Sequence, residues 1–222
     1  MQEKSVAIDG PAGAGKSTLA RALARELGYL YVDTGAIYRT VALRAWEAGA
    51  DPSDPEQIAP LLKGLDLRMD YGADGVQRMY LSGRDVTEAI RVHQISGLAS
   101  QVAALPPVRD FLLDFQRRQA MEHDVVMDGR DIGTNVLPRA EHKFFLTASP
   151  RVRAQRRCDE LRARGQAAEF DQILREVQER DEQDMNRKES PLVRAADAVE
   201  VRTDDLDIDE VVQVLLALMG RA

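Results

Sequence analysis

The sequence has one cysteine, few histidines and no long hydrophobic run. Cys158 alone permits no disulfide within the chain and no thiolate metal cluster. The three histidines are scattered without ligand spacing, so we predict neither a transition-metal site nor a catalytic histidine. No apolar stretch approaches the roughly 18 residues that a membrane span requires, and no secretory signal pattern is present. We therefore expect a cytoplasmic protein that does not bind membranes.

Positive charge is also scarce. The 222 residues include 30 Lys and Arg against 37 Asp and Glu, which gives a net charge of −7. Binding to nucleic acid requires a broad basic surface that displaces counterions, so nucleic acid is not an expected partner. Apolar residues make up 44% and charged residues 30%, as in a soluble α/β domain. No long exposed apolar strip is evident, so we expect a monomer.

The most specific signal is a glycine-rich loop between an apolar run and a helical pattern. It fits G-x-x-x-x-G-K-[ST] at every fixed position, and it comprises Gly10, Pro11, Ala12, Gly13, Ala14, Gly15, Lys16, Ser17 and Thr18. Such glycines let backbone N–H groups and a helix N-terminus approach phosphate oxygens. Lys16 is placed to reach the β- and γ-phosphates, and Ser17 to hold Mg²⁺ directly or through water. We predict that ATP or another nucleoside triphosphate binds here with Mg²⁺.

Apolar strand candidates alternate with helical patterns along most of the chain. This alternation predicts an α/β fold of three layers, αβα, with a central parallel sheet. The expected strands are 5–8, 30–32, 125–127, 143–146 and 198–202, and the last helix spans 208–219 with Val211, Val212, Leu215 and Leu218 facing inward. Ligands in this architecture bind beyond the carboxyl ends of the strands, where Asp9, Asp33 and Asp128 end apolar runs.

The middle of the chain breaks this pattern. Residues 65–71 and 76–81 alternate apolar with polar side chains on either side of a Gly72–Gly75 turn, which predicts an antiparallel hairpin. We expect a small antiparallel insertion within 63–92, with a short third strand near 85–87. Residues 150–188 have the pattern of two helices joined near Gly165.

Several polar residues have both a structural and a functional interpretation. Asp128 follows a buried strand in the manner of a Walker B acid that binds Mg²⁺, but single aspartates also cap turns. The next two residues, Arg130 and Asp131, could bind a phosphate and an amino group. Arg153, Arg156 and Arg157 share one helical face, which fits a solvated surface or a basic lid that closes over polyphosphate and excludes water.

Several stretches, the glycine-rich loop among them, resemble the bacterial cytidylate kinases, a family of nucleoside monophosphate kinases, over essentially the whole chain. The stretches that carry the resemblance are 8–18, 33–39, 100–104, 128–134 and 179–187. The resemblance implies one P-loop kinase domain over 1–222. Its expected parts are a core (1–35, 93–150, 189–222), a monophosphate-binding region with the antiparallel insertion (36–92) and a helical lid (151–188). It also implies transfer of the γ-phosphoryl group from ATP to CMP or dCMP with Mg²⁺.

The resemblance assigns roles to individual residues. Those expected to bind CMP are Thr34, Tyr38, Arg39, Arg109, Arg130, Asp131, Arg180, Asp184 and Arg187, although the family position that matches Thr34 is often serine. Those expected to act in catalysis are Lys16, Asp128, Arg130, Arg153, Arg156, Arg157 and Arg180. A carboxylate such as Asp131 or Asp184 accepts from the amino group of cytosine and is left unpaired against the carbonyl of uracil.

Two other functions share the glycine-rich loop. The first is a P-loop kinase for another small acceptor, such as UMP or shikimate. The insertion and the Gly129-Arg130-Asp131 turn speak against it. A nucleotide-dependent switch ATPase hydrolyses ATP without an acceptor. The sequence lacks the Asn/Thr-Lys-x-Asp run by which GTP switch proteins recognise guanine.

Overall fold

The computed structural model describes residues 4–163 and 165–221. Residues 1–3, 164 and 222, which belong to the expected core and lid ranges, lie outside the described residues. The chain divides into two compact units. One comprises the chain up to Tyr31 together with His123 onward, and the other comprises Val32–Glu122.

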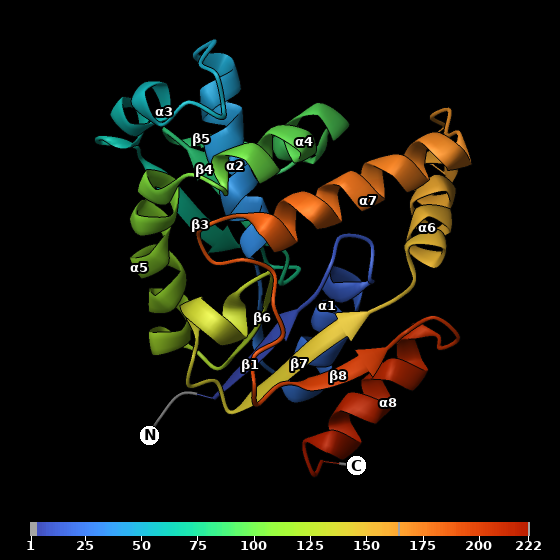
Figure 1. Ribbon diagram of the computed structural model, residues 1–222. Coiled ribbons are helices and arrows are strands. Elements are labelled where there is room, and N and C mark those ends of the chain that lie inside the picture. The colour runs from blue at the N-terminus through green and yellow to red at the C-terminus, as the bar shows by residue number, and fades with distance from the viewer. Residues whose placement is uncertain (1–3, 164, 222) are drawn as a thin grey trace. The chain divides into compact units, whose positions relative to one another are not determined.

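The central sheet has five strands, and all of it except residues 32–33 at the end of one strand belongs to the first unit (Figure 1). Its strand order is β2 (Leu30–Asp33), β6 (Val125–Gly129), β1 (Ser5–Asp9), β7 (His142–Thr147) and β8 (Val199–Arg202). The pairings of β1 with β6, of β1 with β7 and of β7 with β8 are all parallel, and Asp9 lies opposite Gly129. The central parallel sheet and every predicted strand are thereby confirmed, each with its ends within two residues of the expected position.

Both faces of this sheet are buried. Val6, Ile8 and Phe144 belong to a cluster that also contains residues of α1 (Lys16–Leu27) and α8 (Ile208–Leu218). Ala7 and Met127, which point to the opposite face, are fully buried as well. This two-sided burial is typical of a parallel sheet in a three-layer α/β protein.

Helix α8 corrects one detail of the predicted core. Val211, Val212 and Leu215 are buried as expected, but Leu218 is 49% exposed and Met219 is buried in its place. The prediction for Leu218 is therefore wrong. Residues 211, 215 and 218 share a helical face in principle, but the stripe that packs on the sheet is centred on Val212 and Leu215.

The same unit carries a π-helical turn and two further helices. The turn η2 (Ile132–Val136) follows β6, and α6 (Pro150–Ala163) and α7 (Phe170–Asn186) follow β7. Helices α6 and α7 pack on each other through a separate cluster, whose buried members are Ala154, Cys158, Leu161, Ile173 and Val177. Cys158 is therefore a core residue of this helix pair.

The second unit combines helices with an antiparallel sheet. Its sheet has the order β3 (Leu67–Tyr71), β4 (Gln77–Leu81) and β5 (Arg84–Asp85), which confirms the predicted insertion. Strands β3 and β4 form the hairpin, with Met69 opposite Met79. The helices are α2 (Thr34–Glu47), α3 (Pro55–Leu62), η1 (Ala89–Arg91), α4 (His93–Val102) and α5 (Pro106–Glu122).

Candidate active site

The glycine-rich loop joins β1 to α1 and depends on glycine for its shape. Gly10, Gly13 and Gly15 have φ angles of 145°, 76° and 86°, which side chains of L-residues rarely permit. A Cβ atom on Gly10 would also lie 2.0 Å from the carbonyl oxygen of Leu146. The positive φ angles are a local reason for glycine in this loop, and the close approach of strand β7 is a second, tertiary reason for glycine at position 10.

Lys16 points back toward this loop. Its Nζ atom donates to the carbonyl of Pro11 at 2.7 Å, and the residue is only 6% exposed. Burial and the nearby Arg130 charge lower the pKa of Lys16 well below its usual range, against the opposing effect of Asp128, Asp184 and Asp9. An anion at the loop would favour the charged form of this amine.

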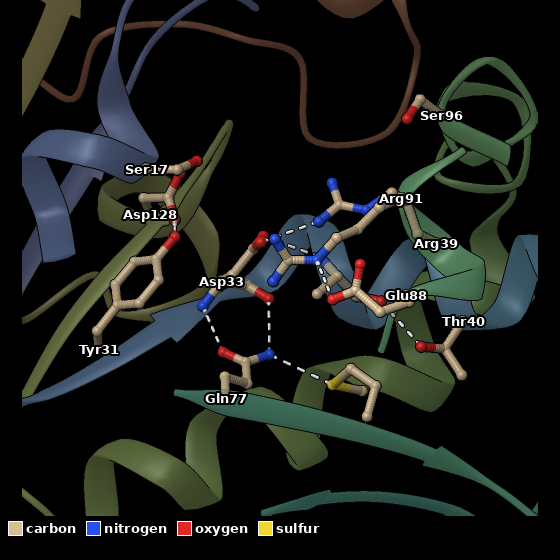
Figure 2. A network of polar contacts seen from close by, with 12 residues as sticks. Ser17, Tyr31, Asp33, Arg39, Thr40, Gln77, Glu88, Arg91, Ser96 and Asp128 are labelled. Carbon is tan, nitrogen blue, oxygen red and sulfur yellow. Dashed lines mark hydrogen bonds and ion pairs between the residues drawn. The ribbon is translucent and has the colours of Figure 1, made fainter. Parts of the chain in front are cut away.

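Ser17 and Asp128 lie side by side at the ends of α1 and β6. Ser17 Oγ donates to Asp128 Oδ2 at 3.0 Å, and the phenol of Tyr31 donates to Asp128 Oδ1 at 2.9 Å (Figure 2). Asp128 is 4% exposed. The structure thus places side by side the two residues that the sequence predicts to hold Mg²⁺. It also shows a contact between Asp128 and Tyr31, a residue that the sequence analysis does not identify.

Asp9 is a second acid that the sequence analysis places at this edge without a role. Its Oδ1 accepts from the backbone N–H of Ile132 at 2.8 Å, and its Oδ2 accepts from that of Gly133 at 2.7 Å. Burial raises the pKa of Asp9 to about 6, although these two hydrogen bonds act in the opposite direction. In the sequence, the only sign of this contact is an acid directly before the first glycine of the loop. The two N–H groups that donate to Asp9 are more than 120 positions away.

Two acid–arginine pairs connect the turn after β6 with the end of α7. Arg130 Nε donates to Asp184 Oδ2 at 2.7 Å, and Arg187 Nη2 lies 3.3 Å from Asp131 Oδ1. Asn135 also donates to Asp131, at 3.1 Å. Burial would raise the pKa of Asp184, but Arg130, Arg180 and Arg187 together hold it below its ordinary value. Five of the predicted acceptor residues therefore belong to one charged cluster in the first unit.

The three arginines of α6 differ in their surroundings. Arg153 is 2% exposed, and its guanidinium donates to the carbonyl of Ala12 at 3.0 Å and to both oxygens of Asp181, a residue of α7. The guanidinium of Arg156 donates to the hydroxyl of Thr203 at 3.1 Å and to its carbonyl. Arg157 pairs with Glu160 at 2.7 Å at the surface. Arg153 thus contacts the glycine-rich loop itself, which we call the phosphate loop from here on.

The remaining candidates belong to the second unit. Asp33 caps α2 by accepting from the backbone of Ala36 at 2.9 Å, and its other oxygen lies 2.9 Å from Arg39 (Figure 2). Gln77 of β4 exchanges two hydrogen bonds with the backbone of Asp33, at 2.8 and 3.2 Å. Thr34 is buried at the first position of α2.

Arg109 and Tyr38 form a pair within the same unit. The Arg109 guanidinium lies 5.7 Å from the centre of the Tyr38 ring and donates to the carbonyl of Ala103 at 3.0 Å. Arg109 is only 6% exposed. The aromatic face and the carbonyl fix the direction of a guanidinium that would otherwise be mobile.

Within 4–163 and 165–221, no three His, Cys, Asp or Glu side chains form a group that could hold a metal ion. Protein-only cages of that type suit zinc or calcium, whereas Mg²⁺ takes one or two protein oxygens and completes its shell with phosphate and water. No helix in the described part of the chain is long and apolar enough to cross a membrane.

Comparisons with known proteins identify the family of this chain. The family model for cytidylate kinase matches residues 6–221. A cytidylate kinase of Carboxydothermus hydrogenoformans is 49% identical over 97% of each chain, and one of Pelotomaculum thermopropionicum is 48% identical over 96% of this chain and 94% of its own.

Similarity among solved structures extends to the fold alone. An uncharacterized protein from Eubacterium ventriosum superposes with a TM-score of 0.53 at 12% identity over 99% of both chains. The family match and the two relatives, by contrast, cover nearly every residue described above. The chain belongs to the cytidylate kinase family.

Proposed function

We propose that this protein transfers the γ-phosphoryl group of ATP to CMP and dCMP. One observation carries the proposal: the first unit places a triphosphate-binding loop and a cluster of paired arginines and acids at the same edge of its sheet. Phosphoryl transfer requires positioning and charge neutralisation more than covalent chemistry, and this edge supplies both. Membership in the cytidylate kinase family selects the acceptor.

The donor is held by the loop from Gly10 to Thr18. Its backbone N–H groups and the N-terminus of α1 bind the phosphates, and the buried amine of Lys16 neutralises the β- and γ-phosphates. Arg153 fixes the loop through its hydrogen bond to the carbonyl of Ala12. We assign Arg156, Arg157 and Arg180 to the charge that develops on the transferred phosphoryl group.

The residues at Ser17 and Asp128 fit Mg²⁺. A hydroxyl and a carboxylate whose oxygens are 3.0 Å apart provide the hard oxygen donors that this ion prefers, and the phosphates and water supply the remaining ligands. Ser17 and Asp128 would hold Mg²⁺ here, and its positive charge would offset the negative charge of the phosphates during transfer. Tyr31 orients the Asp128 carboxylate through its second oxygen.

The acceptor is recognised by its base and its phosphate. Asp131 and Asp184 are the acids that accept from the exocyclic amino group of cytosine. Arg130, with Arg180 and Arg187, keeps the Asp184 carboxylate ionised by lowering its pKa. In the second unit we assign Thr34 and Tyr38 to the nucleoside and Arg39 and Arg109 to the monophosphate. A guanidinium suits this task because it binds phosphate oxygens in a bidentate manner.

One assay tests this function against its alternatives. ADP release from MgATP is measured without an acceptor and then with CMP, dCMP, UMP, AMP and shikimate in turn. The proposal predicts rapid release with CMP and dCMP only. Preference for UMP or shikimate would instead identify a kinase for another acceptor, and rapid release without any acceptor would identify a switch ATPase.

A further inference from the structure

The turn η2 begins with two backbone N–H groups that its own hydrogen bonds do not use. Asn135 and Val136 donate to the carbonyl of Asp131 at 2.9 and 3.1 Å, and Leu137 donates to that of Ile132 at 2.7 Å. The first N–H groups of any helical turn lack partners within the turn and require them from elsewhere. For Ile132 and Gly133 that partner is the carboxylate of Asp9.

Asp9 connects two segments that are distant in the sequence. It immediately precedes Gly10, the first residue of the phosphate loop, and its hydrogen-bond partners immediately follow Asp131. The carboxylate is 4% exposed, so water does not replace it as the acceptor. One side chain thus fixes the backbone beside Asp131 relative to the start of the phosphate loop.

Gly133 lies in a narrow space between Asp9 and Lys143. A Cβ atom on Gly133 would lie 3.4 Å from Asp9 Oδ2 and 3.2 Å from Lys143 Cδ. Lys143 has little freedom to retreat, because its Nζ donates to the carbonyl of Pro138 at 2.7 Å and to Asp197 at 2.7 Å. A side chain at position 133 therefore crowds Lys143 and comes into van der Waals contact with the Asp9 carboxylate.

We propose that Asp9 is a positioning residue for acceptor recognition: its carboxylate holds the start of η2 and thereby sets the place of Asp131 beside the phosphate loop. Asp9 contacts neither substrate in this role. The inference rests on the proposed function, which gives Asp131 the task of recognising cytosine. In addition, one pair of hydrogen bonds holds Asp131 in a fixed position relative to the phosphate loop within the first unit.

The variant Asp9→Asn tests this role with little change in volume. The side-chain oxygen of asparagine can accept from only one of these two backbone N–H groups. Its NH₂ group faces the second N–H, so one hydrogen bond is lost and two donors are brought into repulsive contact. We expect the KM for CMP to rise about 10-fold and the preference for CMP over UMP to fall about 10-fold, while the KM for ATP changes less than about 2-fold. Gly133→Ala should shift the same two quantities in the same direction by a smaller factor.

Val212→Ala is the control for general loss of stability. Val212 is buried in the cluster that α8 contributes to the sheet, away from η2. Its substitution should lower the melting temperature without changing the ratio of CMP to UMP activity. The proposal is overturned if Asp9→Asn leaves that ratio unchanged, or if it raises the KM for ATP as much as that for CMP.

Amide hydrogen exchange gives a second readout that does not depend on activity. In the unliganded protein, exchange at Ile132 and Gly133 should be about 10-fold faster in Asp9→Asn than in Val212→Ala. Equal exchange in the two variants contradicts the positioning role. If the unaltered protein fails to phosphorylate CMP, the proposed function is wrong, and the exchange measurement still decides whether Asp9 holds the turn.

Discussion

Arg130 and Asp184 are 54 positions apart in the sequence, and their side chains form a hydrogen-bonded ion pair with Nε and Oδ2 2.7 Å apart. The side chains of Arg130 and Asp184 are only 19% and 7% exposed. A pair this buried is costly to break, because the remaining charge has no water to replace its partner. It also joins the turn after β6 to the end of α7, two segments that contain most of the proposed acceptor residues of the first unit.

Asp184→Asn should therefore reduce stability at neutral pH. We expect the free energy of unfolding to fall by at least about 2 kcal/mol, because Arg130 stays buried without its counter-charge. The folded-state pKa of Asp184 is lowered, so the ionised group stabilises the protein above its ordinary pKa, and this contribution is lost as the pH falls through the lower, folded-state value. Urea unfolding at pH 7 measures the loss, and Asp171→Asn, an exposed acid of the same helix, serves as the control.

Asp131→Ala should change which acceptor is used while ATP binding survives. The variant removes the carboxylate that we assign to the amino group of cytosine, so the ratio of kcat/KM for CMP to that for UMP should fall by about 10-fold or more. Steady-state kinetics with both acceptors at saturating MgATP provide the measurement. An unchanged preference for CMP over UMP would show that Asp131 does not recognise the base.

Ser17→Ala should weaken the response to Mg²⁺. Removing the hydroxyl takes away one oxygen donor and the hydrogen bond to Asp128 Oδ2. We expect the Mg²⁺ concentration for half-maximal activity to rise about 10-fold, which corresponds to about 1.4 kcal/mol. A titration with Mg²⁺ at fixed ATP checks this, and Ser53→Ala, an exposed serine outside the proposed site, should leave the titration unaltered. An unaltered curve for Ser17→Ala would rule out its part in metal binding.

Arg153→Lys should destabilise the protein although the charge is retained. Lysine cannot reproduce the paired bonds to both oxygens of Asp181 together with the contacts to Ala12 and Ala148. We expect a loss of about 2–3 kcal/mol in the free energy of unfolding, against less than about 0.5 kcal/mol for Arg175→Lys on the exposed side of α7. Equal denaturation midpoints for the two variants would contradict a structural role for Arg153.

Asp9 should make stability depend on pH in the opposite sense to Asp184. Its folded-state pKa of about 6 exceeds the ordinary 3.8, mainly because of burial, with Lys16 and Asp131 the charged neighbours. The stabilisation from its protonated form is complete below the ordinary pKa and is lost as the pH rises through about 6. The free energy of unfolding is measured for the unaltered protein and for Asp9→Asn at pH 4.5 and 7.5. The difference between the two proteins should be smaller at pH 7.5 than at pH 4.5, by about 1–2 kcal/mol. A constant difference would contradict the raised pKa.

Much of the fold follows from patterns within short segments. The strands β1, β6 and β7 appear where apolar runs precede turn residues, and the β3–β4 hairpin appears around Gly72 to Gly75. Asp33 ends an apolar run as expected, and its cap on α2 is a contact with Ala36, only three residues away. These features were predictable because backbone propensity, turn chemistry and alternation act over a few residues.

The sequence by itself determined the phosphate loop and the family, whereas the tertiary structure decided which charged residues hold one another. Glycine permits the positive φ angles at Gly10, Gly13 and Gly15 in any surroundings, so the loop can be predicted from the sequence alone. The contacts of Asp9 with η2, the burial of Arg153 and the exposure of Leu218 have no such local signature. They depend on packing between segments that are far apart in the chain. The sequence permits more than one face of a helix to be buried, and tertiary packing decides which face it is.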